Sequence, residues 1–196
     1  MIVDPETVRE FLDSASFRDW LARNHAAETE VWIKIHKVGS GLKSISPLQA
    51  IDEALCWGWI DGIKKSFDSK SFLQRYTPRG KKSIWSQINV NNVARLAAEG
   101  RMTVQGMKHV EAAKADGRWE RAYTSGSELK IPGDLLDAVN ADPMARETFE
   151  SLSAQNRFAF AFRIHNVKTD AGRKKAVAKF AAMLGRGETI YPQKKK

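Results

Sequence analysis

The sequence predicts an α+β fold, in which helices cover a small antiparallel sheet of about three strands and a helical C-terminal unit follows. Residues 31–36 alternate apolar and polar side chains, which is typical of a half-buried strand. Residues 62–76 have the pattern of a β-hairpin, with a turn around Asp68 and a second strand from Phe72. Most of the remaining chain carries apolar residues at helical spacing.

The chain is expected to begin with helices. Residues 5–24 have apolar side chains at helical spacing. Asp13 and Ser14 should divide this segment into two short helices, and either Ser14 or Ser16 should cap the second one. The strand at 31–36 then follows.

The next helix has the clearest start signal in the chain. Ser46 is a capping residue, Pro47 suits the first turn, and Gln49 completes a capping box. The helix should end near Gly58 or Gly62. Its apolar face is expected to contain Leu48, Ile51, Leu55 and Trp59.

Two further helices are expected after the hairpin. Ser83 should cap a helix over 84–98, and Thr103 should cap another over 104–115.

The C-terminal part consists of short helical patterns. Residues 135–139 and the segment from Pro143 are predicted helices, and Thr169 should cap the last one. Residues 158–162 alternate as a strand does, yet they also share a helical face; we favour a helix because helical patterns flank them. The expected organisation is a core domain at 1–123, a linker at 124–133, a helical segment at 134–188 and a basic tail at 189–196.

The composition limits the classes of function. With 196 residues, of which 42% are hydrophobic, the chain is long enough to bury a sizeable core. The net charge of +9 is concentrated in two patches, 64–82 and 173–196, and the rest of the chain is net acidic. No apolar run approaches the roughly 18 residues of a membrane span, and acids stand where a signal peptide has bases. We therefore expect a cytoplasmic protein without membrane insertion.

The sequence predicts no metal site and no cofactor. A single cysteine, Cys56, excludes an intramolecular disulfide and a cysteine zinc site, and we expect it to be a buried, inert thiol. The histidines have no metal-ligand spacing, and neither a P-loop nor a serine–histidine–acid motif is present. These absences favour a protein that is not an enzyme.

The stretch 53–89 is the candidate site, because aromatic rings alternate there with fixed cations. The pattern suits a small anionic or aromatic ligand. The free N–H groups of a helix starting at Ser83 would add anion donors, and Asn89 should lie on the same helical face as Trp85. The predicted ligand-binding residues are Trp57, Asp61, Arg75, Arg79, Ser83, Trp85 and Asn89.

Two of the residues in this stretch have alternative interpretations. Asp61 is either a carboxylate at the mouth of a pocket or the partner of a nearby arginine, Arg75 or Arg79. Among the tryptophans, Trp59 fits a buried face, whereas Trp57 falls off it and is the preferred exposed ring.

The ordered motifs resemble a known family. They include Glu53-Ala-Leu-Cys-Trp-Gly-Trp-Ile-Asp-Gly62, Thr77-Pro-Arg79, Ser83-Ile-Trp-Ser86, Gly100-Arg-Met-Thr103 and Gly117-Arg-Trp119, followed by Asp142-Pro143 and a closing helix at Arg173. Together they look like the YdeI/OmpD-associated (OmdA) family, also labelled bacteriocin-protection. The resemblance covers nearly the whole chain and implies a bacterial, stress-associated protein, with no catalytic residues to carry over. Trp57 departs from the family pattern, in which phenylalanine is more frequent at this position.

Three functions remain open at this point. The first is a stress-associated protein that binds a small anionic or aromatic molecule in a cleft between the 57–61 helix end and the 75–85 loop. The second is nucleic-acid binding through the two basic patches. The third is an enzyme with Asp61 as acid/base, which predicts that Asp61 is buried and that its pKa is raised.

Overall fold

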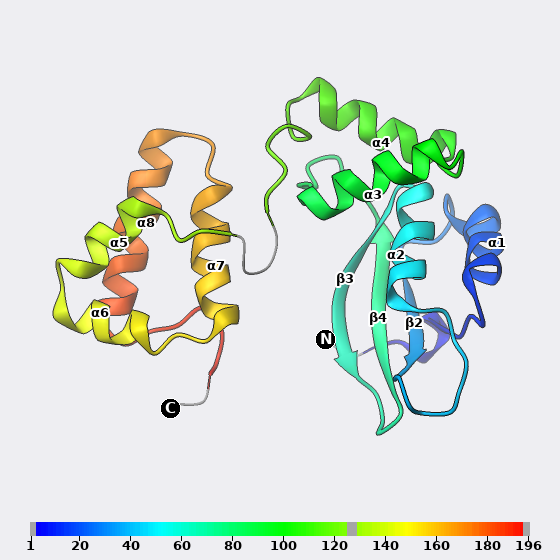
Figure 1. Ribbon diagram of the computed structural model, residues 1–196, viewed down its shortest axis with the longest axis horizontal. Coiled ribbons are helices and arrows are strands. Elements are labelled where there is room, and N and C mark those ends of the chain that lie inside the picture. Colours follow the sequence, from blue (N-terminus) through cyan, green and yellow to red (C-terminus); the bar gives the residue numbers. More distant parts are fainter. Residues whose placement is uncertain (1–2, 125–128, 194–196) are drawn as a thin grey trace. The chain divides into compact units, whose positions relative to one another are not determined.

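The protein divides into two compact units, Met1–Ala122 (the N-terminal unit) and Tyr123–Lys196 (the C-terminal unit). The computed structural model describes residues 3–124 and 129–193 (Figure 1). Part of the expected linker, 125–128, and the last three lysines of the expected tail therefore lie outside the described residues.

The N-terminal unit is an α+β structure, as the sequence predicts. Its elements are η1 (Pro5–Thr7), β1 (Val8–Arg9), α1 (Ser14–Asn24), β2 (Val31–His36), α2 (Pro47–Cys56), β3 (Trp59–Ser66), β4 (Ser71–Pro78), α3 (Gln87–Ala98) and α4 (Val104–Ala115). Helices α1 and α2 lie along the sheet, and α3 and α4 lie beyond one end of it (Figure 1). A hydrophobic core that includes Phe17, Leu21 and Ile33 fills the space between α1, α2 and the sheet.

The sheet has four strands in the order β1-β2-β4-β3, instead of about three. The predicted hairpin is confirmed, because β3 and β4 pair in antiparallel fashion. The predicted strand at 31–36 is confirmed as β2, which pairs antiparallel with β4. The sheet is nevertheless mixed, since β1 lies parallel to β2 with Val8 opposite Trp32.

The additional strand explains why the prediction of a helix from residue 5 was wrong. Asp4 caps only a short 3-10 turn, after which Val8 and Arg9 extend along the edge of β2. Pairing with an open strand edge satisfies backbone groups that a short isolated helix would hold only weakly. The true helix, α1, is capped by Asp13, and Ser16 completes its capping box.

Helix α2 begins as predicted and ends earlier than its apolar pattern suggested. Ser46 and Gln49 form the capping box. The helix ends at Cys56, so Trp59 belongs to β3 and Leu48, which is 74% exposed, does not share a buried face with it. Trp59 is nevertheless core, as expected, with 1% of its surface exposed.

The C-terminal unit is helical, with α5 (Gly133–Asn140), α6 (Pro143–Glu150), α7 (Ala154–His165) and α8 (Asp170–Gly185). Helix α8 packs against the other three helices, and residues 158–162 are helical, as we favoured. The fully buried Asn156 holds the segment after α8: it accepts a hydrogen bond from the Tyr191 backbone N–H at 2.9 Å and donates to Gln193 Oε1 at 2.8 Å. Among the described helices, none combines the length and apolar composition of a membrane span.

Candidate ligand-binding site

Arg79 lies at the centre of the predicted site, directly after β4. Its backbone N–H donates to the Gly58 carbonyl at 2.9 Å, which fixes the chain after α2 against the end of the hairpin. The guanidinium lies 3.7 Å from the centre of the Trp85 ring and donates to the Ile84 carbonyl at 3.1 Å. Only 3% of Arg79 is exposed. The Arg79 guanidinium therefore stacks on the Trp85 indole.

Trp85 is a core residue. It is 2% exposed, and the Trp119 ring lies edge-on to it at 4.8 Å. Both rings pack in the core formed by α2, α3 and α4. An indole covered in this way supports Arg79 and offers little open face for a ligand to stack on.

Asp61 lies on β3 opposite Tyr76, on the face of the sheet that α1 and α2 cover. Burial raises the pKa of Asp61 above its ordinary value, and the charge of Arg79 opposes this shift without cancelling it. Burial, followed by the charge of Asp61, raises the pKa of Tyr76. The Tyr76 hydroxyl is buried and makes no hydrogen bond to the described residues.

Arg75 is not part of this group. Successive side chains on a strand point to opposite faces, so Arg75 projects away from the face on which Tyr76 and Asp61 lie. It pairs instead with Glu30, with 2.6 Å between Nη2 and Oε2. The pairing of Asp61 with Arg75 that the sequence left open therefore does not occur.

Ser83 does not cap a helix, which corrects the predicted start of α3. The cap is Ser86, whose hydroxyl accepts from the Asn89 backbone N–H at 3.2 Å. The Ser83 carbonyl accepts from Arg118 at 2.8 Å, and the Ile84 carbonyl accepts from Arg79. A helix starting at Ile84 would need these carbonyls for its own N–H groups, so the two arginines keep the segment extended.

Trp57 is half-buried and is not the exposed ring that the sequence suggested. It caps α2, and its ring lies 4.7 Å from that of His25. Both rings border a small cavity of about 150 Å³, which we call the Trp57 hollow. Its lining consists of His25, Trp57, Gly58, Trp59, Pro78, Gln105, Lys108 and His109.

The Trp57 hollow lies in a positive environment. Burial lowers the pKa of His109, and the charges of Arg79 and Arg118 lower it further. Lys108 adds an ammonium group to the lining. The Trp57 Nε1–H is buried and donates no hydrogen bond to the described residues. Charges of this sign favour an anion over a cation.

The histidines and Lys108 were missed as site residues in the sequence. His25 follows α1 and His109 lies on α4, far apart in the sequence and without any local motif. The sequence signal that could have pointed to them was the Trp57-Gly58-Trp59 turn, because Trp57 contacts His25 and Gly58 lies close to His109. Only the packing of α4 against α2 brings His109 to this turn.

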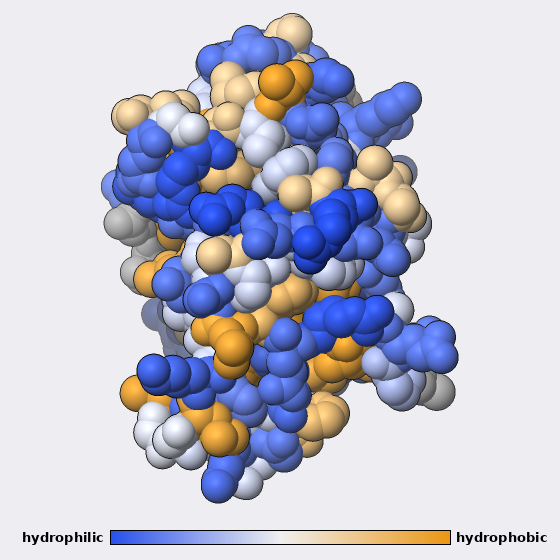
Figure 2. All heavy atoms as spheres, turned by 90° about the vertical axis from the view of Figure 1, so that its right-hand side faces the viewer, coloured by the Kyte–Doolittle hydropathy of each residue, from blue (hydrophilic) through white to orange (hydrophobic). Residues whose placement is uncertain are grey.

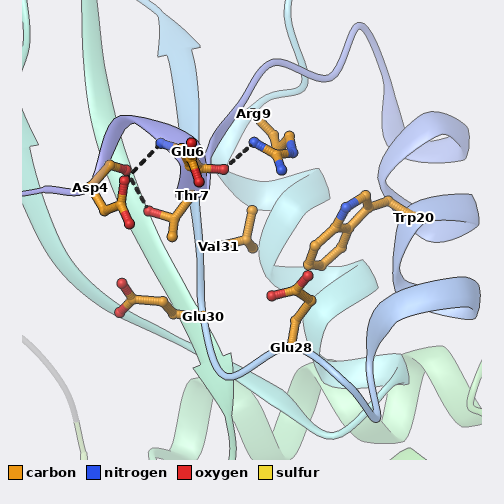
Figure 3. A pocket seen from close by; sticks show the side chains of 8 residues that line it. All are labelled: Asp4, Glu6, Thr7, Arg9, Trp20, Glu28, Glu30 and Val31. Atoms are coloured by element: carbon orange, nitrogen blue, oxygen red, sulfur yellow. Dashed lines mark hydrogen bonds between the residues drawn. The ribbon is translucent and has the colours of Figure 1, made fainter.

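A second hollow, of about 500 Å³, is acidic (Figure 3). Glu28, Glu30 and the ring of Trp20 border it on one side, and Asp4, Glu6 and Arg9 on the other. Two of its carboxylates have structural partners: Glu30 pairs with Arg75, and Asp4 accepts from the Glu6 backbone N–H at 2.9 Å. This hollow is therefore explained by the fold.

Two further titratable side chains, Cys56 and Glu53, are buried. Cys56 is buried as expected, which raises the pKa of its thiol to about 12. Glu53 is 2% exposed but is neutralised by Arg101 at 2.8 Å and accepts a hydrogen bond from the Ser14 hydroxyl. Within the described residues, no group of three or more histidine, cysteine or acidic side chains is arranged to hold a metal ion.

Two family models match the chain. Residues 9–109, more than half of the chain, match the domain of unknown function DUF8412, and residues 128–187 match the family described as Bacteriocin-protection, YdeI or OmpD-Associated. The chain belongs to the DUF8412 family and carries an OmdA domain. The OmdA resemblance is thus confirmed for the C-terminal segment, while the motifs around Trp57 lie in the DUF8412 match. No curated protein and no solved structure matches the chain.

Proposed function

We propose that the N-terminal unit binds a small anionic or aromatic molecule at the Trp57 hollow. The observation that carries this proposal is the lining itself, in which the indole of Trp57, two imidazoles and Lys108 border one cavity. Aromatic faces and cations at one cavity suit a planar anion. The proposal keeps Trp57 from the predicted site and adds His25, Lys108 and His109.

The size of the hollow limits the ligand. A cavity of about 150 Å³ has room for a molecule of about the size of benzene. This favours a single-ring acid or a small oxyanion over a nucleotide. That Asp61, Arg79 and Trp85 line a ligand cavity together stays a prediction.

Calorimetric titration with benzoate and with inorganic phosphate tests the proposal. Replacing Lys108 with glutamine should weaken binding by about tenfold or more, because a hydrogen bond to a charged group is lost. Lys114→Gln is the matched control, since Lys114 lies on the same helix but pairs with Glu111 at 3.2 Å. Absence of binding for both probes, or an equal loss in both variants, would refute the proposal.

A second proposal, that Asp61 serves as an acid/base in an unknown reaction, has one supporting observation. Burial raises the pKa of Asp61, which lies opposite Tyr76 on the neighbouring strand. NMR titration of the Asp61 carboxyl tests it directly. A pKa at or below the ordinary value of about 3.9 would contradict this role.

Nucleic-acid binding has less support than it had from the sequence. In the first patch Arg79 is buried and Arg75 pairs with Glu30. In the second patch Arg173 pairs with Asp134 and Arg186 with Glu188. Binding through phosphates would require these cations to be available and would weaken steeply with salt.

The biological setting is also a proposal. The OmdA description refers to bacteriocin protection, and we infer that this protein has a stress-associated role in bacteria. We further propose a cytoplasmic location. Fractionation of cells that produce the tagged protein would test the location.

A further inference from the structure

Apolar side chains protrude at one end of the N-terminal unit. In the loop after β2, Val38 is fully exposed at 107% and Leu42 is 54% exposed. Phe67 in the hairpin turn is 55% exposed, and Leu12 before α1 is 74% exposed. Figure 2 shows apolar side chains gathered among hydrophilic ones at the lower end of the face it draws, the end at which the hairpin turn lies in Figure 1.

The loop and the hairpin turn are tied to each other by hydrogen bonds. The Lys37 backbone N–H donates to the Lys70 carbonyl at 2.8 Å. The Lys37 ammonium donates to the carbonyls of Asp68 at 3.0 Å and Ser69 at 3.1 Å. These bonds hold the loop and the hairpin turn side by side.

A shallow cavity of about 440 Å³ lies beside the loop after β2. Leu12, Val38, Leu42 and Lys43 all border it. Gly39 and Gly41 have φ of 84° and 76°, a left-handed backbone that shapes the loop around this cavity. We call the surface formed by Leu12, the loop 37–44 and the hairpin turn 66–70 the apolar–basic tip.

The tip also carries lysines. Lys43, in the loop, and Lys70, in the hairpin turn, are both exposed. The tip has one acid, Asp68, whose carboxylate accepts from the Lys70 backbone N–H at 2.8 Å, and the three lysines Lys37, Lys43 and Lys70 outweigh its charge. The tip therefore combines positive charge with exposed aliphatic and aromatic side chains.

We propose that the apolar–basic tip adsorbs to the surface of an anionic lipid membrane. Lysines are attracted to the negative surface potential, while the protruding Val38 and Leu42 insert among the acyl chains near the headgroups. A nucleic acid would attract the same lysines, but its phosphate backbone would leave these apolar groups in water. Exposed apolar groups rimmed by lysines thus favour lipid over a polynucleotide. Adsorption of this kind needs no membrane-spanning helix.

Co-sedimentation of the full chain with vesicles tests the proposal. Vesicles of phosphatidylcholine mixed with anionic phosphatidylglycerol should carry the protein down, whereas pure phosphatidylcholine vesicles should not. The double variant Val38→Ser/Leu42→Ser should lose most of this binding. Lys43→Gln should weaken it about fivefold, the effect expected for one basic residue near an anionic surface.

Matched controls lie elsewhere in the N-terminal unit. Val104→Ser replaces a valine that is 69% exposed at the start of α4, and Lys81→Gln removes an exposed lysine after β4. Neither control should change vesicle binding. The proposal is overturned if the chain does not bind anionic vesicles, or if Val38→Ser/Leu42→Ser binds as well as the unaltered chain. It is also overturned if a short RNA duplex binds more tightly than the vesicles and that binding depends on Lys43 alone.

Discussion

At the scale of single residues, Gly58 decides how the predicted site is built. Its φ of 73° lies in the left-handed region, which lets the chain turn directly from α2 into β3. A Cβ at this position would lie 2.5 Å from His109 Cδ2. The same residue accepts the Arg79 N–H, so one glycine positions the hollow, the histidine and the buried arginine.

Replacing Gly58 with alanine should therefore cost more than backbone strain alone. We expect a loss of more than about 2 kcal/mol in the free energy of unfolding, from strain and the clash with His109 together. Gly100→Ala is the control, because its φ is 67° but nothing lies within 4 Å of the added Cβ. It should cost about 1 kcal/mol. Urea denaturation measures the free energy of unfolding of both variants. If Gly58→Ala and Gly100→Ala lose the same amount, the clash with His109 makes no contribution.

Trp59 gives the second prediction at this scale. It is 1% exposed, and the Trp20 ring meets it edge-on at 5.8 Å. Trp59→Ala should reduce the free energy of unfolding by about 3–5 kcal/mol, the usual effect of removing a large buried aromatic side chain. Ile88→Ala, at a position that is 57% exposed, should change it by less than about 0.5 kcal/mol. A loss below about 1 kcal/mol for Trp59→Ala would contradict its place in the core.

At the scale of elements, the start of α3 shows how tertiary contacts select among local signals. Ser83 and Ser86 are both suitable caps in the sequence, and only Ser86 is used. Arg118 and Arg79 bind the carbonyls of Ser83 and Ile84. The first turn of the longer helix is lost because those carbonyls are already occupied.

This correction can be tested by two substitutions. Ser86→Ala should reduce the free energy of unfolding by about 1 kcal/mol, because the Asn89 N–H loses its acceptor. Ser83→Ala should change it by less than about 0.5 kcal/mol, because its hydroxyl caps no helix. Thermal or urea melts of the two variants are sufficient. A larger loss for Ser83→Ala than for Ser86→Ala would show that Ser83 is the cap.

At the scale of the whole molecule, ion pairs and capping bonds set the response to acid. Among the described residues, seven carboxyl groups have a lowered pKa, in each case chiefly because they accept a hydrogen bond from a lysine, an arginine or a serine: Glu10, Asp13, Asp68, Glu99, Asp116, Asp134 and Glu188. A lowered pKa in the folded state stabilises the protein above the pKa of the unfolded state. That contribution is lost as the pH falls through the folded value.

The free energy of unfolding should therefore fall as the pH decreases from about 5 to about 2. Asp61 acts in the opposite direction, because its pKa is raised and its charged form is disfavoured in the folded protein. Asp61→Asn should consequently be more stable than the unaltered chain near neutral pH, and the difference should shrink in acid. Urea melts from neutral pH into acid would measure the difference in the free energy of unfolding between the two proteins. A difference that does not change with pH would contradict the raised pKa of Asp61.

The sequence by itself determined the elements whose signals are local. The capping box at Ser46, the hairpin at 62–76 and the caps at Thr103 and Thr169 depend on neighbouring residues, and all four are confirmed.

Only the tertiary structure decided what depends on distant partners. Val8 and Arg9 form a strand because they pair with the edge of β2, whereas their apolar spacing had predicted a helix. Arg118 binds the Ser83 carbonyl, and α3 starts after Ser86 instead of Ser83. The ion-pair partner of Arg75 is Glu30, 45 positions away in the sequence. His25 and His109 meet Trp57 because α1 and α4 both pack against α2. Contacts between residues far apart in the chain leave no spacing in the sequence, so packing alone determines them.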